Sequence, residues 1–374
     1  MRKLIFWSHL TVGLMVALIV LMLSLTGLLL TYEAQITRWA QTPAVSEVGA
    51  ERLSADELAG IAAIETGGRA TALRFAKDPD APVAVQVGRN STLFLDPFTG
   101  DLLPEQGAGV VAFFFTVEHL HRWFALSGDG RDLGRAVTGA ANLGFLFLLA
   151  SGLYLWWPRA WKWRMVRMNL WFRKGLPSSK ARDYNWHHVF GFWALVPLLA
   201  IAVSGVVISY PWASDLVFRL YGEEPVQLRR RAGAGQGASD AVAEVSGLDL
   251  ALLQASANIP EWQRMEVALP LAEKIRVTVD SGTGRQPTKQ VTLTMDARDG
   301  AVLERSEFSD RSAGQQARIF LRFLHTGEIF GLLGQTLAGL AAAFALVMTY
   351  TGAALSYRRL IQPLLQRRRS RQTG

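Results

Sequence analysis

Histidine is the side chain in this sequence best suited to hold a metal or a cofactor. Neutral imidazole is a common ligand of iron, copper and zinc. Cysteine is absent, which excludes disulfides, iron–sulfur clusters, thiolate catalysis and a thioether-linked c-type haem. Any redox or metal centre therefore depends on the six histidines, which are His9, His119, His121, His187, His188 and His325.

These histidines lie in or beside long apolar stretches. Four stretches lack Asp, Glu, Lys and Arg, namely 4–32, 136–158, 186–214 and 329–357. About 20 apolar residues suffice to cross a bilayer. With 50% hydrophobic and 19% charged residues, the chain has the composition of a membrane protein with sizeable polar segments. Ionisable side chains at membrane depth are costly and tend to be functional.

The basic residues predict the orientation of these helices. Residues 1–8, 158–186 and 358–374 hold 16 of the 39 basic residues but one of the 31 acidic ones. Lys and Arg concentrate in cytoplasmic loops, so both termini are expected in the cytoplasm. The basic pI is thereby explained without nucleic acid. The first apolar run is too long for a signal peptide and has no cleavage site, so we expect an uncleaved helix.

The chain repeats itself. At an offset of 178, His9 and Gly13 align with His187 and Gly191, and "TGLLLTY" aligns with "SGVVISY". At an offset of 200, "LDPFTGDLL" aligns with "MDARDGAVL", and Gly152 with Gly352. Both halves begin in the cytoplasm, so the repeat is parallel. The expected fold is an α-helical membrane protein, a four-helix transmembrane bundle built from two parallel repeats, each with an α+β domain on the outer face.

Each outer segment has one helix and several short strands. "SADELAGIAAI", with Ser54 as N-cap, predicts a helix. Strands are expected over 70–76, 81–87 and 91–97 in the first segment, and over 264–269, 274–279 and 290–296 in the second, after a helix over 248–257. No nucleophile with an evident base occurs in them, so we interpret them as scaffold or docking modules.

The repeat sorts the histidines into two pairs. His9 and His187 fall at the cytoplasmic ends of helices one and three, and His121 and His325 fall just before helices two and four. Imidazoles from two facing helices are a common way for a bundle to hold a b-type haem. Gly13 and Gly191, one turn away, leave room for a flat macrocycle. Zinc is less favoured because carboxylate or thiolate ligands are missing.

Some residues keep more than one interpretation. His119 and His188 have no counterpart in the other half. Each could be a substitute ligand, a partner of a ligand or a proton-linked group, and a solvated or propionate-facing role is favoured. Glu118, Arg122 and Glu328 could meet propionates, protons or a metal complex, or lie at a solvated interface. "GAGQGA" at 233–238 formally fits a dinucleotide fingerprint, but it follows "RRR" instead of a strand and is interpreted as a linker.

The chain resembles the PepSY-associated transmembrane helix family. The resemblance rests on "SHLTVG" and "WHHVFG", on "LHRW" and "LHTG", and on the two hairpins "LDPFTGDLL" and "MDARDGAVL". Similar members include inner-membrane ferrisiderophore reductases, which have four helices, two periplasmic PepSY-like domains and haem b. The resemblance implies two haems b with His9, His187, His121 and His325 as axial ligands of the haem iron, and His188 and His119 as alternates.

The expected segments follow from this resemblance and the repeat. Membrane helices are expected over 1–32, 135–158, 187–211 and 332–357, PepSY-like domains over 33–116 and 212–318, interfacial segments over 117–134 and 319–331, a cytoplasmic loop over 159–186 and a basic cytoplasmic tail over 358–374.

The expected function is an oxidoreductase of the bacterial inner membrane. A multi-pass, haem-dependent ferric-siderophore reductase would pass electrons across the membrane and release Fe(II) in the periplasm, because siderophore oxygens prefer Fe(III). The chain has no recognisable nucleotide-binding domain, so the expected donor is a quinol or a cytoplasmic reductase. The alternative is a non-enzymatic, membrane-anchored PepSY binding protein or a siderophore or metal transport component.

Overall fold

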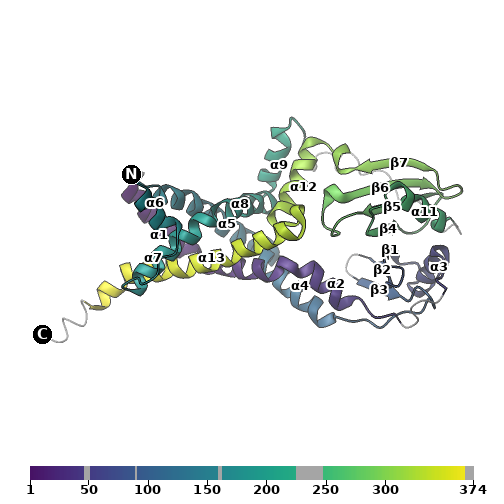
Figure 1. The fold of residues 1–374 in the computed structure, drawn as a ribbon, viewed down its shortest axis with the longest axis horizontal. Coiled ribbons are helices and arrows are strands. Elements are labelled where there is room, and N and C mark those ends of the chain that lie inside the picture. The colour runs from purple at the N-terminus through teal and green to yellow at the C-terminus, as the bar shows by residue number, and fades with distance from the viewer. Residues whose placement is uncertain (46–50, 89–90, 159–161, 225–246, 367–374) are drawn as a thin grey trace. The chain divides into compact units, whose positions relative to one another are not determined.

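A computed structural model describes residues 1–45, 51–88, 91–158, 162–224 and 247–366 of the chain. The expected linker at 233–238 and the end of the basic tail lie outside these residues. The chain divides into two compact units. We call Met1–Glu33, Phe113–Val217 and Phe320–Gly374 the membrane unit, and Ala34–Ala112 and Phe218–Ile319 the sheet unit. Figure 1 labels the elements of both units.

The membrane unit is built from long apolar helices (Figure 1). These are α1 (Arg2–Leu29), α5 (Gly130–Trp156), α7 (Ser179–Trp193), α8 (Leu195–Ser209) and α13 (Gly331–Leu360). In the described part of the chain, three helices are long and apolar enough to cross a membrane, and a fourth crossing results if α7 and α8 form one bent span. The prediction of a helical membrane protein is thus confirmed.

The bend between α7 and α8 differs from the single straight span expected there. The two helices meet at Ala194 at an angle of 66°. Pro197 lies one turn into the segment after the break, and because it has no N–H it cannot bond the carbonyl of Trp193. The first repeat has Ile19 at the equivalent place, and α1 continues through it. Proline therefore accounts for a difference between the halves.

The long helices pack through small residues. α1 contacts α5 and α13, α5 also contacts α8, and α13 also contacts α7 and α8. A buried cluster joins Leu149, Leu198, Ala202, Ala341 and Ala345. Small side chains allow helix backbones to approach closely in membranes, where van der Waals packing drives association.

The chain also contains shorter helices. They are α2 (Glu33–Gln41), α4 (Ala108–Trp123), α6 (Trp163–Leu170), α9 (Pro211–Leu220) and α12 (Ala313–His325). Short 3₁₀ turns occur at Leu30–Tyr32, Pro287–Lys289, Phe308–Asp310 and Glu328–Phe330. Gly134 of α5 lies so close to the carbonyl of Trp123 that a Cβ would clash, and Gly334 of α13 lies equally close to Gly327. These contacts fold the ends of α4 and α12, which carry His121 and His325, back against α5 and α13.

The sheet unit contains one antiparallel sheet with the order β3-β2-β1-β4-β5-β6-β7. Its strands are β1 (Ala70–Ala76), β2 (Val83–Val87), β3 (Ser91–Leu95), β4 (Arg264–Ala268), β5 (Lys274–Asp280), β6 (Gln290–Asp296) and β7 (Val302–Glu307). The two helices are α3 (Ala55–Glu65) and α11 (Leu248–Asn258). The strands expected from alternation coincide with β1 to β6, and β7 is additional.

The two expected periplasmic modules are joined by the pairing of β1 with β4. Leu73 pairs with Val267 and Phe75 with Met265. Arg74 and Glu266 pair at its centre, with an N–O distance of 2.6 Å. Joining the strands covers two edges that separate modules would leave with unpaired backbone groups.

The helices of the sheet unit also interlock. Asp56 of α3 accepts hydrogen bonds from the N–H groups of Gly247 and Leu248, at 3.1 and 3.0 Å, and Asp249 of α11 accepts one from Ala55 at 2.8 Å. Each carboxylate thus caps the other helix. Ser54 forms the expected N-cap of α3, in a capping box with Glu57.

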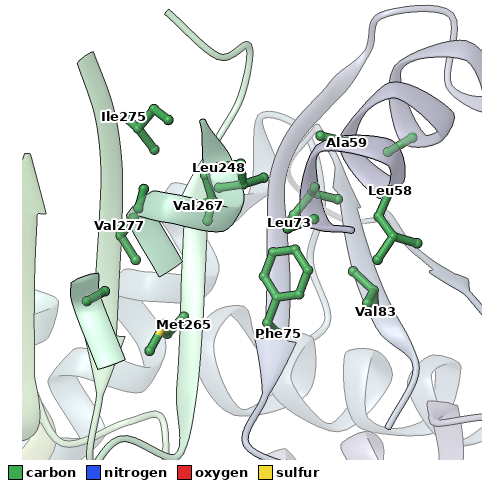
Figure 2. Close-up of a cluster of buried hydrophobic side chains, with 14 of the residues drawn as sticks. Leu58, Ala59, Leu73, Phe75, Val83, Leu248, Met265, Val267, Ile275 and Val277 are labelled. Carbon is green, nitrogen blue, oxygen red and sulfur yellow. The ribbon is translucent and has the colours of Figure 1, made fainter. Parts of the chain in front are cut away.

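One hydrophobic core serves both halves of the sheet. Figure 2 shows it continuing from the half around α3 into the half around α11. Its largest fully buried members include Leu58, Leu73, Leu248, Met265 and Ile275. The two halves of the sheet unit are therefore expected to fold as one body.

Candidate functional site

The four repeat-related histidines share one environment. The Nδ1 atom of each lies within hydrogen-bond distance of a hydroxyl on a neighbouring helix. The pairs are His9 with Ser151 at 2.8 Å, His187 with Thr351 at 3.0 Å, His121 with Thr26 at 2.7 Å and His325 with Ser204 at 3.2 Å. All four hydroxyl residues are buried. The offsets of 178 and 200 relate these pairs across the halves, with a small shift at His121 and His325.

The hydroxyl groups fix which ring nitrogen is free. Each one donates to a carbonyl one turn earlier in its own helix, at 2.6 to 2.8 Å. Its oxygen is therefore left to accept a hydrogen bond from Nδ1–H. The carbonyl of Ile201, 2.9 Å from His325 Nδ1, can only accept as well. In this tautomer Nε2 keeps its lone pair, which is the arrangement of a metal-binding histidine whose other nitrogen is held by a partner.

A glycine follows each of these hydroxyl residues and lies against the same imidazole. A Cβ added at Gly152 would come within 3.4 Å of His9, and at Gly352 within 3.4 Å of His187. The distances are 3.5 Å from Gly27 to His121 and 3.2 Å from Gly205 to His325. At each of the four histidines, a Ser/Thr-Gly dipeptide thus provides the hydroxyl that bonds Nδ1 and the glycine that leaves space beside the ring. We call each such dipeptide a histidine socket.

The outer pair, His121 and His325, has its rings facing each other. Their centroids are 6.4 Å apart and the ring planes differ by 62°. Histidine nitrogen binds metals at about 2.0–2.1 Å, which puts two rings on opposite sides of one iron about 6 Å apart. Burial, followed by the neighbouring His325 and Arg122, lowers the pKa of His121 to about 3. The spacing and the neutral imidazole both fit one iron between these rings.

The inner pair, His9 and His187, has the same sockets but a more open arrangement. No ring contact joins these two imidazoles in the described part of the chain. Seventeen residues separate His9 from Thr26 in α1, and the same number separates His187 from Ser204. Along a straight helix such as α1 that is about 25 Å. The distance between the two layers is therefore comparable with the thickness of a hydrocarbon core, about 30 Å.

The two alternates have other partners, although the ring of His188 lies 6.3 Å from that of His187. The ring of His119 lies between Phe115 and Trp123 of its own helix, at centroid distances of 4.0 and 4.7 Å. His188 donates from Nδ1 to the carbonyl of Tyr184 at 2.8 Å, and its ring lies on the Tyr184 ring. None of these partners is the hydroxyl or the glycine of a histidine socket. The environments thus distinguish His121 from His119 and His187 from His188.

Other predicted neighbours have different contacts. Gly13 and Gly191 face Leu148 and Met348, so the glycines beside the imidazoles are those of the sockets. Arg122 pairs with Glu118 at 2.6 Å and lies over the ring of Trp123. Glu328 is buried and accepts a hydrogen bond from Thr326 at 2.8 Å.

The sockets are the signal that sequence reasoning missed. The alignment of "TGLLLTY" with "SGVVISY" and of Gly152 with Gly352 contains all four dipeptides. They resemble small helix-packing residues, because a hydroxyl in an apolar helix often bonds only its own backbone. Their role as hydrogen-bond partners of histidine depends on which helix lies opposite, and the sequence does not show this.

The described residues contain no group of three or more His, Asp or Glu side chains able to hold a metal ion. The ligands available are thus pairs of imidazoles, which suit a metal that brings its other ligands with it, as haem iron does. The donor set and the glycines beside the rings fit a bis-histidine haem.

Comparison with known families agrees with the membrane helices. A family model described as PepSY-associated TM region matches residues 6–359, which include all four sockets. No curated protein matches the chain. Because the family model covers nearly the whole sequence, the chain belongs to the PepSY-associated TM region family.

Proposed function

We propose that this protein is an inner-membrane di-haem b reductase that delivers electrons to ferric siderophores in the periplasm and releases Fe(II). Its membrane unit would be a four-helix bundle of two parallel repeats, with both termini in the cytoplasm. The observation that carries the proposal is the set of four buried histidine sockets, arranged in two layers, with His121 and His325 at the spacing of two ligands of one iron.

The chain's own residues have separate roles in this proposal. His121 and His325 would hold one haem, and His9 and His187 the other. Bound haem supplies one-electron redox chemistry. The socket hydroxyls hold each imidazole in the tautomer that leaves Nε2 free, and the apolar side chains between the layers exclude water. Hydrogen bonding and burial of this kind tune iron potentials.

The choice of substrate rests on the resemblance to ferrisiderophore reductases and on iron chemistry. Siderophores bind Fe(III) through hard oxygen ligands, which hold Fe(II) less well, so reduction favours release. The outer pair lies near the outer membrane face in the proposed orientation. Arg122 and Glu118, which are partly exposed beside His121, are candidates to meet the incoming complex.

The proposal is tested by mixing dithionite-reduced, desalted protein with ferric siderophores under anaerobic conditions. We expect the reduced haem bands to disappear while an Fe(II) chelator captures iron. The gallium(III) complexes are the matched control, because gallium has the same charge and is not reduced under these conditions. Reduced bands that persist equally with ferric and gallium complexes, across hydroxamate and catecholate siderophores, would contradict the proposal.

A further inference from the structure

A cavity of about 330 Å³ lies at the end of the membrane unit where α7 begins. Its lining includes Asn169, Arg173, Lys180, Tyr184, Asn185 and Leu355. The volume is at the lower end of the range for small-molecule sites, about 300–1,000 Å³. In the proposed orientation this end faces the cytoplasm.

The wall of the cavity is fixed by one buried amide. Asn185 is 4% exposed. It donates to the carbonyls of Met168 and Trp171 at 3.0 and 3.1 Å and accepts from the N–H of Arg173 at 3.0 Å. These bonds tie the end of α6 and the turn after it to α7. The cavity is therefore formed by ordered backbone and does not depend on a ligand to assemble it.

Two helices place the cavity next to the inner histidine pair. Tyr184 lies three residues before His187 in α7, and Leu355 lies four residues after Thr351, the socket residue of His187, in α13. One helical turn is about 5.4 Å. The Tyr184 ring also lies on the His188 ring, with centroids 4.1 Å apart. A molecule in the cavity would thus be about one turn from the inner ligands.

The charge of the cavity favours an anion. Arg173 and Lys180 line it, and no carboxylate does so among the described residues. The acid closest in sequence, Asp183, is buried and pairs with Arg182 at 2.9 Å and Arg358 at 2.5 Å. Phosphate oxygens are good partners for Arg and Lys, and a planar ring is a good partner for Tyr184.

We propose that this cavity is where electrons enter the protein, and that it binds a phosphate-bearing planar donor of the reduced flavin mononucleotide class. The inference rests on the proposed reductase function and names its donor. A neutral quinol would make no charge-assisted hydrogen bond with Arg173 or Lys180, both of which are exposed. A separate cytoplasmic flavin reductase would supply the donor.

The electron balance suits such a donor. The anionic flavin hydroquinone loses two electrons, one at a time, and one proton to become oxidised flavin. The proton leaves to cytoplasmic water, and the two electrons reduce two ferric complexes on the other side of the membrane. Each electron thus has a named donor and a named acceptor.

Flavin binding tests the site directly. Full-length protein in phosphatidylcholine nanodiscs is titrated with flavin mononucleotide, followed by flavin fluorescence. We expect Arg173→Gln with Lys180→Gln to weaken binding by about tenfold or more, the equivalent of about 1.4 kcal/mol. Arg164→Gln, an exposed arginine of α6 that does not line the cavity, is the control and should bind like the wild type. Riboflavin, which lacks the phosphate, should bind weakly to all forms.

Several outcomes would overturn the assignment. Equal affinity in the double variant and in Arg164→Gln would do so. Loss of flavin binding when phosphatidylglycerol replaces phosphatidylcholine would assign the cavity to a lipid headgroup instead.

The same titration on the His9→Ala, His325→Ala protein separates this inference from the proposed function. Flavin binding in this variant, if it depends on Arg173 and Lys180, would support the site independently of haem. If the wild-type protein binds flavin in this way but is purified without haem, the site is supported and the reductase is contradicted. In haem-loaded protein, photoreduced flavin should reduce the haem more slowly in the double variant, while dithionite should reduce both forms equally.

Discussion

At the residue scale, the feature that decides the chemistry is the hydroxyl behind each histidine. Thr351→Val keeps the shape of the side chain but removes the oxygen that accepts from His187 Nδ1. Loss of such a partner typically weakens metal binding 10- to 100-fold. We therefore expect the variant to release haem faster to a haem-scavenging globin. Thr349→Val is the matched control, because its hydroxyl bonds the carbonyl of Ala345 in its own helix. Equal release from both variants would refute the role of the socket.

At the element scale, tight glycine contacts position the outer histidines. A Cβ at Gly334 would clash with the carbonyl of Gly327 and the Cβ of Phe330, and overpacking of this kind costs about 1–3 kcal/mol. Gly334→Ala should displace α12, remove about half of the haem and lower the melting temperature measured by circular dichroism. Gly109→Ala, in α4, meets nothing within 4 Å and should keep full haem content. Unchanged haem in Gly334→Ala would show that this contact does not position His325.

Local patterns in the sequence predict most elements but not their breaks or neighbours. The expected strand over 70–76 is β1, and Ser54 caps α3 as expected. The third membrane helix is expected as one span over 187–211, whereas α7 begins at Ser179 and ends at Trp193, before α8. Pro197 is the residue in the sequence that indicates this break. Alternation shows which face of a strand is buried, but not which strand lies beside it, so the pairing of β1 with β4 could not be predicted.

At the scale of the whole molecule, the internal repeat is the most informative property of the sequence. It relates His9 to His187 and His121 to His325 through residue order alone. It could not show that Ser151 faces His9 or that Thr26 faces His121, because those contacts join helices far apart in the chain. The sheet unit is joined at the middle of the β1–β4 pairing, where Arg74 and Glu266 form an ion pair.

The central claim, two haems held by two histidine pairs, is tested most directly by counting haem in purified variants. The wild type should contain two haems per chain with low-spin bis-histidine spectra. His325→Ala and His187→Ala should each lose one of them, while His119→Ala and His188→Ala, which change the alternates, should keep both. A colourless wild type expressed with ample haem, or full haem content in both His325→Ala and His187→Ala, would contradict the account.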